Sequence, residues 1–318
     1  MDVVVVGSCN TDLSSYVSRL PLRGETLTGT RFETGFGGKG ANQCVAAAKL
    51  GAKTALVGKL GEDVFGVQYL SNLLSNNINC EHVQSLKTAS TGVASIFVGN
   101  DGTTFLKSLC SNCIVIVPGA NNLLSVDDVN QAEALISSSK LVVCQNEIPQ
   151  ETTLAALKLA KKCGVKTIFN PAPADKDLDL ELFSLPDFFC ANETEASLLL
   201  NQEVSDVESA KKACHQLIES KGCNTVIITL GEKGVVYQTR INLEVEHIPA
   251  TPVTAIDTTG AGDSFIGSLA YYMTNMEQLP LSKMIDRAGQ IAAISVQKPG
   301  TQKSFPLASE LPLGLLSS

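Results

Sequence analysis

The stretch DTTGAGDSF, from Asp257 to Phe265, predicts a strand that runs through a glycine turn into a helix beginning at about Ala261. Gly260, Ala261 and Gly262 would form the turn at the helix N-terminus, where backbone N–H groups have no partner within the helix. Successive N–H groups of this kind bind anions, and the helix dipole adds to the attraction. The stretch therefore predicts a phosphate site where a strand meets a helix.

Asp263 stands in this turn, and a carboxylate there repels a phosphate group unless it has a chemical role. Accepting a proton from an attacking hydroxyl group is such a role. The turn would then stabilise the charge that develops on a transferred phosphoryl group. The alternative is that Asp263 only caps the helix. We interpret Asp263 as a catalytic base, with Gly260, Ala261 and Gly262 as an anion hole.

Before this stretch, short β-branched runs alternate with segments whose apolar residues recur at helical spacing. The predicted strands are Val3–Val6, Thr54–Val57, Leu141–Cys144, Lys166–Phe169, Asp187–Ala191 and Thr225–Thr229. The predicted helices are Ala41–Leu50, Val64–Asn76, Asp127–Ser137, Gln150–Cys163, Glu193–Leu200 and Asp206–Glu219, with a late one over Lys283–Gln297. The alternation indicates an α/β fold, a doubly wound and mostly parallel sheet flanked by helices. Parallel strands buried on both faces are continuous apolar runs, as these are.

Two regions break the alternation and predict a small antiparallel β lid. Residues 11–36 lack a helical period, and residues 91–117 contain two strands, TGVASIFVG and CIVIVPG. Between the two strands lies Asn100-Asp101-Gly102, a hairpin turn signal. We expect one face of this lid to be polar. Because no linker interrupts the chain, we predict a single domain over residues 1–318, with the lid at about 11–36 and 91–117.

The composition favours a globular protein of the cytoplasm, with the nucleus as an additional compartment. A net charge of −8 and the lack of a long Lys/Arg run argue against a nucleic-acid surface. No apolar run approaches the ~20 residues of a membrane span, and Asp2 with the short run Val3–Val6 argues against a signal peptide. The 10 cysteines lie mostly in apolar segments, which predicts buried, reduced thiols.

A second glycine cluster, GFGGKGANQ from Gly35 to Gln43, matches parts of two nucleotide motifs, but its context fits neither. A dinucleotide loop needs a strand immediately before its first glycine, and a P-loop needs glycine where Glu33 stands and Ser or Thr where Gly40 stands. The cluster instead begins a helix at about Ala41, and its glycines would let a ligand approach the backbone. We expect a small ligand rich in hydroxyl groups; the alternative is a turn that only caps the helix.

Together with GGKGANQ and DTTGAGDSF, three further motifs have the order and approximate spacing seen in the ribokinase family of sugar kinases, which the chain resembles over nearly its whole length. They are NPAPA (Asn170–Ala174), NETE (Asn192–Glu195) and TLGEKG (Thr229–Gly234). The terminal stretches VVVVGSCNTD (Val3–Asp12) and SVQKPGTQKSFP (Ser295–Pro306) also match, and they are most similar to eukaryotic members. The pairing of NTD with GGKGAN and CQNEIP resembles members that act on ribose.

The resemblance implies an enzyme that uses ATP to phosphorylate D-ribose at O5, giving D-ribose 5-phosphate, with Asp263 as base. The implied sugar-binding residues are Asn10, Thr11, Asp12, Gly38, Lys39, Gly40, Ala41, Asn42, Glu147 and Asp263. Within this set the Asp12 carboxylate would accept hydrogen bonds, and the Asn10 amide would both donate and accept. The implied nucleotide-binding residues are Asn192, Thr229, Leu230, Gly231, Glu232, Lys233, Gly234, Gly262 and Asp263.

The resemblance also implies two metal ions and a homodimer formed through the lid. Asn192 and Glu195 would hold Mg²⁺ through water, which suits an ion that keeps its hydration shell. A K⁺ ion would lie beside the anion hole, with Asp257, Thr259, Ser295, Lys298, Gly300 and Ser304 at the matching positions. The ammonium group of Lys298 must then point away from the ion.

Two departures from the family pattern leave alternatives open. Gly289 stands where relatives often carry an asparagine that reaches the nucleotide base, so we expect a weaker or less selective adenine site. Residues 103–113 lengthen the lid hairpin; they are either a surface insertion, which loops tolerate, or an error of gene prediction. The alternatives to a ribose kinase are another sugar or nucleoside kinase of the family and a non-catalytic sugar-binding relative.

Overall fold

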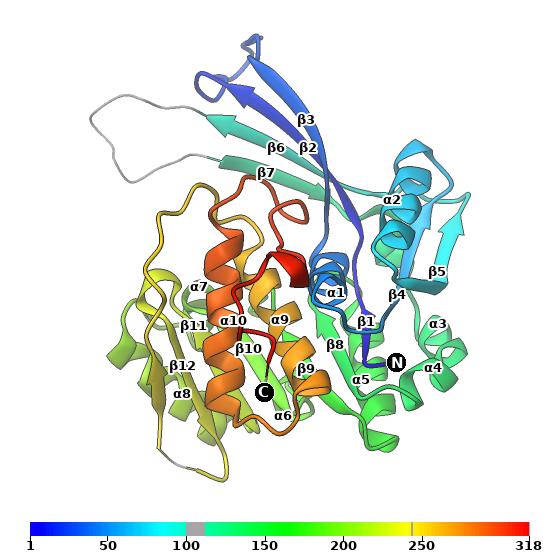
Figure 1. Ribbon diagram of the computed structural model, residues 1–318. Helices are drawn as coiled ribbons and strands as arrows, with labels where there is room; N and C mark the ends of the chain where they lie inside the picture. The colour runs from blue at the N-terminus through cyan, green and yellow to red at the C-terminus, as the bar shows by residue number, and fades with distance from the viewer. Residues whose placement is uncertain (100–111, 243, 318) are drawn as a thin grey trace.

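The computed structural model describes residues 1–99, 112–242 and 244–317. Within them, nine strands form one sheet in the order β13-β12-β11-β10-β9-β8-β1-β4-β5 (Figure 1). These strands are β1 (Val3–Val6), β4 (Thr54–Gly61), β5 (Asn79–Leu86), β8 (Leu141–Gln145), β9 (Lys166–Asn170), β10 (Phe188–Asn192), β11 (Thr225–Thr229), β12 (Val235–Thr239) and β13 (Glu246–Ile248). Neighbours from β5 to β11 are parallel, whereas β12 and β13 pair antiparallel at one edge. The predicted mostly parallel sheet is confirmed.

Helices cover both faces of this sheet, close to their predicted positions. They are α1 (Lys39–Lys49), α2 (Val64–Ser75), α3 (Val126–Gln131), α4 (Glu133–Ser137), α5 (Gln150–Lys162), α6 (Glu181–Ser184), α7 (Glu193–Leu200), α8 (Val207–Lys221), α9 (Ala261–Asn275) and α10 (Leu281–Ser295), with 3₁₀ turns η1 (Gly119–Leu123), η2 (Gly231–Lys233) and η3 (Ala308–Glu310). The predicted single helix Asp127–Ser137 is wrong in one respect. It is divided at Ala132, whose ψ of 8° lies outside the helical range.

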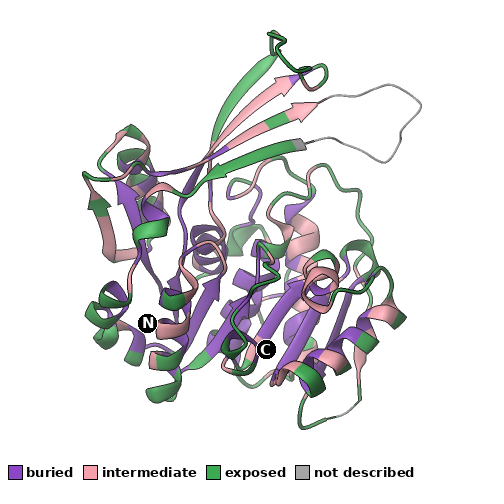
Figure 2. Ribbon diagram, turned by 180° about the vertical axis from the view of Figure 1, so that it is seen from behind, coloured by how far each residue is buried: buried purple, intermediate pink, exposed green. Residues whose placement is uncertain are grey.

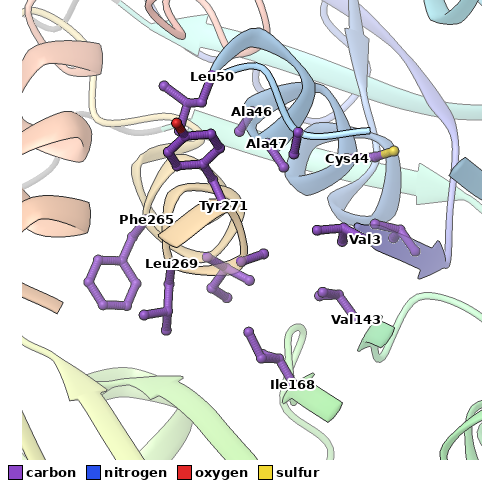
Figure 3. Close-up of a cluster of buried hydrophobic side chains, with 14 of the residues drawn as sticks. Val3, Cys44, Ala46, Ala47, Leu50, Val143, Ile168, Phe265, Leu269 and Tyr271 are labelled. Carbon is purple, nitrogen blue, oxygen red and sulfur yellow. The ribbon is translucent and has the colours of Figure 1, made fainter. Parts of the chain in front are cut away.

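Alternate residues of β1 enter two separate hydrophobic cores, one on each face of the sheet. Val3 and Val5 pack with apolar residues of α1, α9 and α10, and Figure 3 shows part of this core. Val4 and Val6 pack with apolar residues of α5 and α8 on the opposite face. Figure 2 accordingly shows buried strands beneath helices whose outer surfaces are exposed. Burial on both faces explains why β1 is an unbroken run of valines.

The sequence analysis did not find β5, β12 and β13. β5 and β13 are the two edge strands, and their residues are partly exposed and often polar. They therefore lack the continuous apolar run that marks a central parallel strand. β12 runs antiparallel to β11 with only η2 between them. It therefore lacks the preceding long helix by which the other strands were recognised in the sequence.

The lid is confirmed as a second sheet of four strands, in the order β3-β2-β6-β7, which rises above the main sheet (Figure 1). Its strands are β2 (Asn10–Val17), β3 (Arg31–Gly37), β6 (Gly92–Gly99) and β7 (Asn112–Val117). Two antiparallel pairs, β2 with β3 and β6 with β7, join in parallel between β2 and β6. The predicted turn at 100–102 and most of the 103–113 segment lie outside the described residues.

The expected polar face of the lid is wrong, because both faces carry apolar side chains. Ile114 and Ile116 lie on the face that carries Asp12, whereas Phe97 and Val115 lie on the other face. Their exposed fractions range from 36% to 55%. Successive residues of a strand point to opposite faces, so the unbroken apolar run of β7 makes both faces apolar.

Two further expectations concern membrane-spanning helices and the burial of the cysteines. No helix in the described ranges is long and apolar enough to cross a membrane. Most of the cysteines in those ranges are buried, as predicted, and Cys113 in the lid is exposed.

Candidate active site

The turn from Gly260 to Gly262 stands at the N-terminus of α9, as predicted, but the strand predicted before the turn is wrong, because residues 249–257 form no strand. Gly260 has a φ of 78°, in the region that favours glycine, and a Cβ there would lie 2.6 Å from Cγ2 of Thr301. The amides of Gly262 and Asp263 belong to the first helical turn, where the helix offers no acceptor. A Cβ on Gly262 would meet no atom within 4 Å. The open side of the turn borders a cavity of about 140 Å³ and can bind an anion there.

The Asp263 side chain points from the first turn of α9 towards α1. It is 7% exposed. Its Oδ2 accepts a hydrogen bond from Nδ2 of Asn42 at 2.9 Å, and its Oδ1 accepts one from Nε2 of Gln43 at 3.0 Å. No side chain caps α9, so a mere capping role for Asp263 does not fit. Each carboxylate oxygen has a further lone pair, so the group can accept a proton from a hydroxyl in the cavity that it lines.

A second carboxylate, that of Glu147, is fixed where the strand order of the sheet reverses. Glu147 follows β8 and Ser8 follows β1, the two strands from which the order runs in opposite directions. Oε2 of Glu147 accepts from Oγ of Ser8 at 2.6 Å and from the backbone N–H of Lys39 at 2.9 Å. Lys39 is the first residue of α1, so the helix dipole favours this negative charge. Open α/β sheets bind ligands at such reversal points.

Asn121 determines the orientation of the Asn10 amide. The backbone N–H of Cys9 donates to Oδ1 of Asn121 at 2.8 Å, which leaves Nδ2 of Asn121 facing Oδ1 of Asn10 at 2.8 Å. A backbone N–H can only donate, so it determines the orientation of both amides. The NH₂ group of Asn10 is therefore available to donate to a ligand, and its oxygen, which has a second lone pair, can still accept.

Asp12 lies close to two other carboxylates. Burial, with smaller contributions from Glu147 and Asp263, raises the pKa of Asp12 to about 7. Burial alone would lower the pKa of the nearby Lys39, but Asp263, Glu147 and Glu195 together raise it above its ordinary value. The site thus concentrates carboxylates around one ammonium group, and hydroxyl groups of a ligand can satisfy the acceptors.

The glycines at the start of α1 are required by close packing within the protein. A Cβ on Gly38 would lie 2.6 Å from the backbone nitrogen of Asn10, and one on Gly40 would lie 2.5 Å from that of Ser8. These glycines therefore let α1 pack closely against the chain that leaves β1. Thr11 and Ala41 are also buried away from the site, Ala41 in the hydrophobic core and Thr11 on the lid face opposite Asp12.

A larger cavity, of about 750 Å³, lies on the other side of the glycine turn. The two cavities share Thr229, Gly262 and other lining residues, so they meet at the turn. Of the predicted nucleotide residues, this cavity is lined by Thr229, Gly231, Glu232, Lys233, Gly234 and Gly262, while Asn192 and Asp263 line the smaller one. Leu230 packs in the hydrophobic core instead. Gly289 lines the larger cavity, and a Cβ there would meet no atom within 4 Å.

Comparison with known proteins identifies the family. A family model described as pfkB family carbohydrate kinase matches residues 1–308. The chain belongs to the pfkB family. A mouse protein named ribokinase is 50% identical over 313 residues, which cover 98% of this chain and 94% of the mouse protein. A Salmonella typhi protein named deoxyribokinase is 40% identical over 96% of each chain.

Solved structures agree with this assignment to the pfkB family. The structure of Arabidopsis thaliana ribokinase complexed with ribose and ATP matches with a TM-score of 0.87 and 31% identity, covering 100% of this chain and 99% of that one. A ribokinase structure from Giardia lamblia matches with a TM-score of 0.86 and 31% identity, covering 97% of this chain and 96% of that one. The family resemblance and the fold predicted from the motifs are both confirmed.

In this pfkB family chain, Asn192 and Glu195 are suitably placed to hold Mg²⁺ through water. They form a capping box at the start of α7, in which Oδ1 of Asn192 accepts from the backbone N–H of Glu195 at 2.8 Å, and Oε2 of Glu195 accepts from that of Asn192 at 2.9 Å. Both residues line the smaller cavity with Asp263. Burial raises the pKa of Glu195, and a nearby cation would favour its charged form. Mg²⁺ prefers a few carboxylates together with water and substrate phosphates, so these residues fit.

The residues expected around K⁺ lie in two segments that are tied together. The predicted set is Asp257 and Thr259 before the turn, and Ser295, Lys298, Gly300 and Ser304 near the C-terminus. Oδ2 of Asp257 accepts from the backbone N–H of Gly300 at 2.9 Å and joins the two segments. Nζ of Lys298 lies 3.3 Å from Oε1 of Glu310, so the ammonium group points away as a cation site requires. These oxygen donors fit a hard monovalent cation.

The residues of the candidate site that were not assigned from the sequence include Ser8, Gln43, Asn121 and Gln302. Ser8, Gln43 and Gln302 stand inside motifs that carry the family resemblance, so position in a motif was a usable signal. Asn121 lies in η1, outside those motifs. Its role depends on a contact with Asn10 across 111 positions of the chain, which no local pattern shows.

Proposed function

We propose that the chain transfers the γ-phosphoryl group of ATP to O5 of D-ribose, giving D-ribose 5-phosphate and ADP. The position of Asp263 is the observation that carries this proposal. It lines the smaller cavity at the glycine turn together with Lys39 and Glu195, and the larger cavity opens beyond the turn. The smaller cavity shares Lys39 and Asp263 with the predicted sugar-binding residues, so a sugar held by those residues and a nucleotide in the larger cavity would meet at Gly262 and Asp263. The relatives named ribokinase support ribose as the sugar.

In the proposed reaction, Asp263 accepts the proton of the 5-hydroxyl as O5 bonds to the γ-phosphorus and the bond to the β,γ-bridging oxygen breaks. The amides of Gly262 and Asp263 stabilise the charge that develops on the phosphoryl oxygens. Asp12 accepts hydrogen bonds from the sugar and Asn10 donates to it, which aligns O5. Asn192 and Glu195 would hold Mg²⁺ through water, which would neutralise charge at the phosphates, and Asp257 and its neighbours would hold K⁺, which would order the glycine turn.

A panel of acceptors tests the proposal directly. ADP release is measured with ribose, deoxyribose, fructose and adenosine, each with and without K⁺. We expect ribose to give the highest kcat/KM and K⁺ to raise it. Deoxyribose is the second candidate, because a relative that is 40% identical is named deoxyribokinase. Robust turnover of another acceptor without turnover of ribose would contradict the proposal, and ribose binding by calorimetry without turnover would indicate a non-catalytic relative.

Lys39 is expected to serve both substrates, since it lines the smaller cavity with Gly262 and Asp263. Its ammonium group can therefore approach the transferred phosphoryl group as well as the sugar. For Lys39→Met, we expect kcat to fall and the KM of ribose to rise, each by about tenfold or more, since a hydrogen bond to a charged group contributes about 1.5–3 kcal/mol. Steady-state kinetics with each substrate varied separately measures both, with the exposed Lys53→Met as control. A change in the KM of ATP alone would show that Lys39 does not contact the sugar.

We further propose that two copies of the chain associate through the lid. Phe32, Phe97, Val115 and Val117 share the lid face opposite Asp12, with exposed fractions of 36% to 61%. A second copy could cover this face without blocking the sugar site, and apolar surface of this kind favours association.

We also propose that the protein is located in the cytoplasm. Its buried thiols suit the reducing conditions there.

Val115→Lys is expected to convert the dimer to a monomer at micromolar concentration, because it places a charge in the proposed apolar contact. Analytical ultracentrifugation measures the change. Leu74→Lys, an equally exposed apolar position on α2 with an exposed fraction of 56%, is the matched control and should leave the mass unchanged. A wild-type chain that sediments as a monomer would refute the proposed dimer.

A further inference from the structure

Two chains of hydrogen-bonded amides converge on the Asp263 carboxylate, and each begins at a backbone carbonyl. One begins at the carbonyl of Cys190, which accepts from Nδ2 of Asn170 at 2.8 Å. Oδ1 of Asn170 accepts from Nε2 of Gln43 at 3.1 Å, and the same nitrogen donates to Asp263. A carbonyl can only accept, so its position determines which end of each amide faces the base. This chain comes from the interior of the main sheet.

The second chain comes from the lid and the C-terminal loop. The hydroxyl of Tyr69 donates to the carbonyl of Gly37, the last residue of lid strand β3. The Tyr69 oxygen must therefore accept, and it does so from Nε2 of Gln302 at 3.2 Å. That nitrogen also donates to Oδ1 of Asn42 at 3.0 Å, which leaves Nδ2 of Asn42 facing Asp263 at 2.9 Å.

Gln302 is held firmly enough to impose this orientation. Its side chain is buried, and its Oε1 accepts from Nδ2 of Asn72 at 2.8 Å. Its backbone carbonyl accepts from Nζ of Lys49 at 2.7 Å, so the loop itself is fixed to α1. Figure 1 shows this C-terminal segment, in red, beside α1. Each polar group of the Gln302 side chain thus has a partner. Turning the amide over would place its oxygen against the acceptor of Asn42 and its nitrogen against the donor of Asn72.

We propose that Gln302 is a positioning residue for Asp263, acting through Asn42, and that it links the C-terminal loop and the lid strand β3 to the base. Without the donor from Gln302, Oδ1 of Asn42 loses that hydrogen bond, and the Asn42 amide is held only from the side of the carboxylate. A buried amide oxygen left without its donor is unfavourable, so Asn42 would shift towards another donor and hold the Asp263 carboxylate less firmly. The inference rests on the proposed role of Asp263 as base.

The test compares Gln302→Met, which keeps the length of the side chain without its amide, with Gln302→Glu, which keeps the shape and the acceptor for Asn72 but cannot donate as a carboxylate. We expect both variants to lower kcat by about 10- to 100-fold and to shift the acidic limb of the kcat profile to higher pH, since the base loses a donor. Gln297→Met, an exposed glutamine on the same segment, should leave both unchanged. Tyr69→Phe removes the link to Gly37. It should also lower kcat and shift the acidic limb to higher pH, but by less than the two Gln302 variants do.

The outcomes separate this inference from the proposed function. If wild type does not phosphorylate ribose, the proposed function fails, and the same variants are compared with whichever acceptor is turned over. Wild-type kcat and an unshifted acidic limb in folded Gln302→Met would overturn the inference. Restoration of kcat by Gln302→Glu would also overturn it, because it would show a role in packing alone. If Gln302→Met does not fold, the acidic limb of Tyr69→Phe decides.

Discussion

Asp263→Asn is expected to lower kcat for ribose phosphorylation by about 10²- to 10⁴-fold, the usual contribution of a general base. The amide has nearly the same shape as the carboxylate, and one of its ends can still accept from Asn42 or Gln43. The site should therefore stay intact, and the Kd of ribose measured by calorimetry should change little. The activity that remains should no longer fall towards acidic pH as the wild-type kcat does, because the asparagine side chain does not ionise.

The control for this variant is Asp127→Asn, which removes an exposed carboxylate from the first turn of another helix, α3. It should have wild-type kcat. Retention of kcat in Asp263→Asn would show that another group, or water, removes the proton. A loss of ribose binding equal to the loss of kcat would instead show that Asp263 acts mainly by holding the sugar.

Asp12→Asn is expected to weaken ribose binding by about 10²-fold, since hydrogen bonds to a charged acceptor contribute about 1.5–3 kcal/mol each. In wild type, ribose should bind more tightly as the pH rises through about 7, where the Asp12 carboxyl ionises. Binding near neutral pH should release protons, because hydroxyl donors favour the ionised form. Calorimetry in buffers of different ionisation enthalpy measures that release. Equal proton release by wild type and Asp12→Asn would rule out Asp12 as the source.

The same substitution should make the ligand-free protein more stable at high pH. The pKa of Asp12 is about 7 in the folded chain, against an ordinary value of 3.8, so the folded state holds the proton over this interval. The stability contributed by protonated Asp12 is complete below about pH 4 and is lost as the pH rises through 7. Asp12→Asn should therefore exceed wild type by up to about 4 kcal/mol above pH 7, and by much less near pH 4. Glu33→Gln, an exposed carboxylate of β3, is the control.

Much of the fold could be predicted because apolar periodicity is a local property. β1 and β8 are unbroken apolar runs, and each is buried on both faces of a parallel sheet. β5 escaped detection because an edge strand needs no such run, and its residues are mostly half-buried. The lid faces were wrongly predicted because the run Ile114–Val117 is apolar at every position. Which face is covered depends on what packs there, and a strand pattern does not contain that information.

Site residues could be predicted where an unusual residue type stands in a recognisable motif. They were missed where their role depends on contacts between distant parts of the chain. Asp263 is an unusual carboxylate in a phosphate turn, and that anomaly is visible in nine letters of sequence. The orientation of the Asn10 amide is not visible there, because it depends on the backbone of Cys9 and on Asn121. Leu230 lies in a motif shared with true lining residues, but it packs into the core. Membership of a motif therefore predicts that a residue lies near the site. Only the packing shows which of the motif's side chains line it.

The hydrogen bond between Gln302 and Asn42 joins positions 260 residues apart, and the bond between Asp263 and Asn42 spans 221. A ribosome adds about 5–20 residues each second, so the N-terminal half of the site waits for many seconds before its partners are made. Until then the polar start of α1 has neither the base nor the loop to satisfy it. No N-terminal fragment can be active, and folding must be completed by contacts distant in sequence, which form slowly.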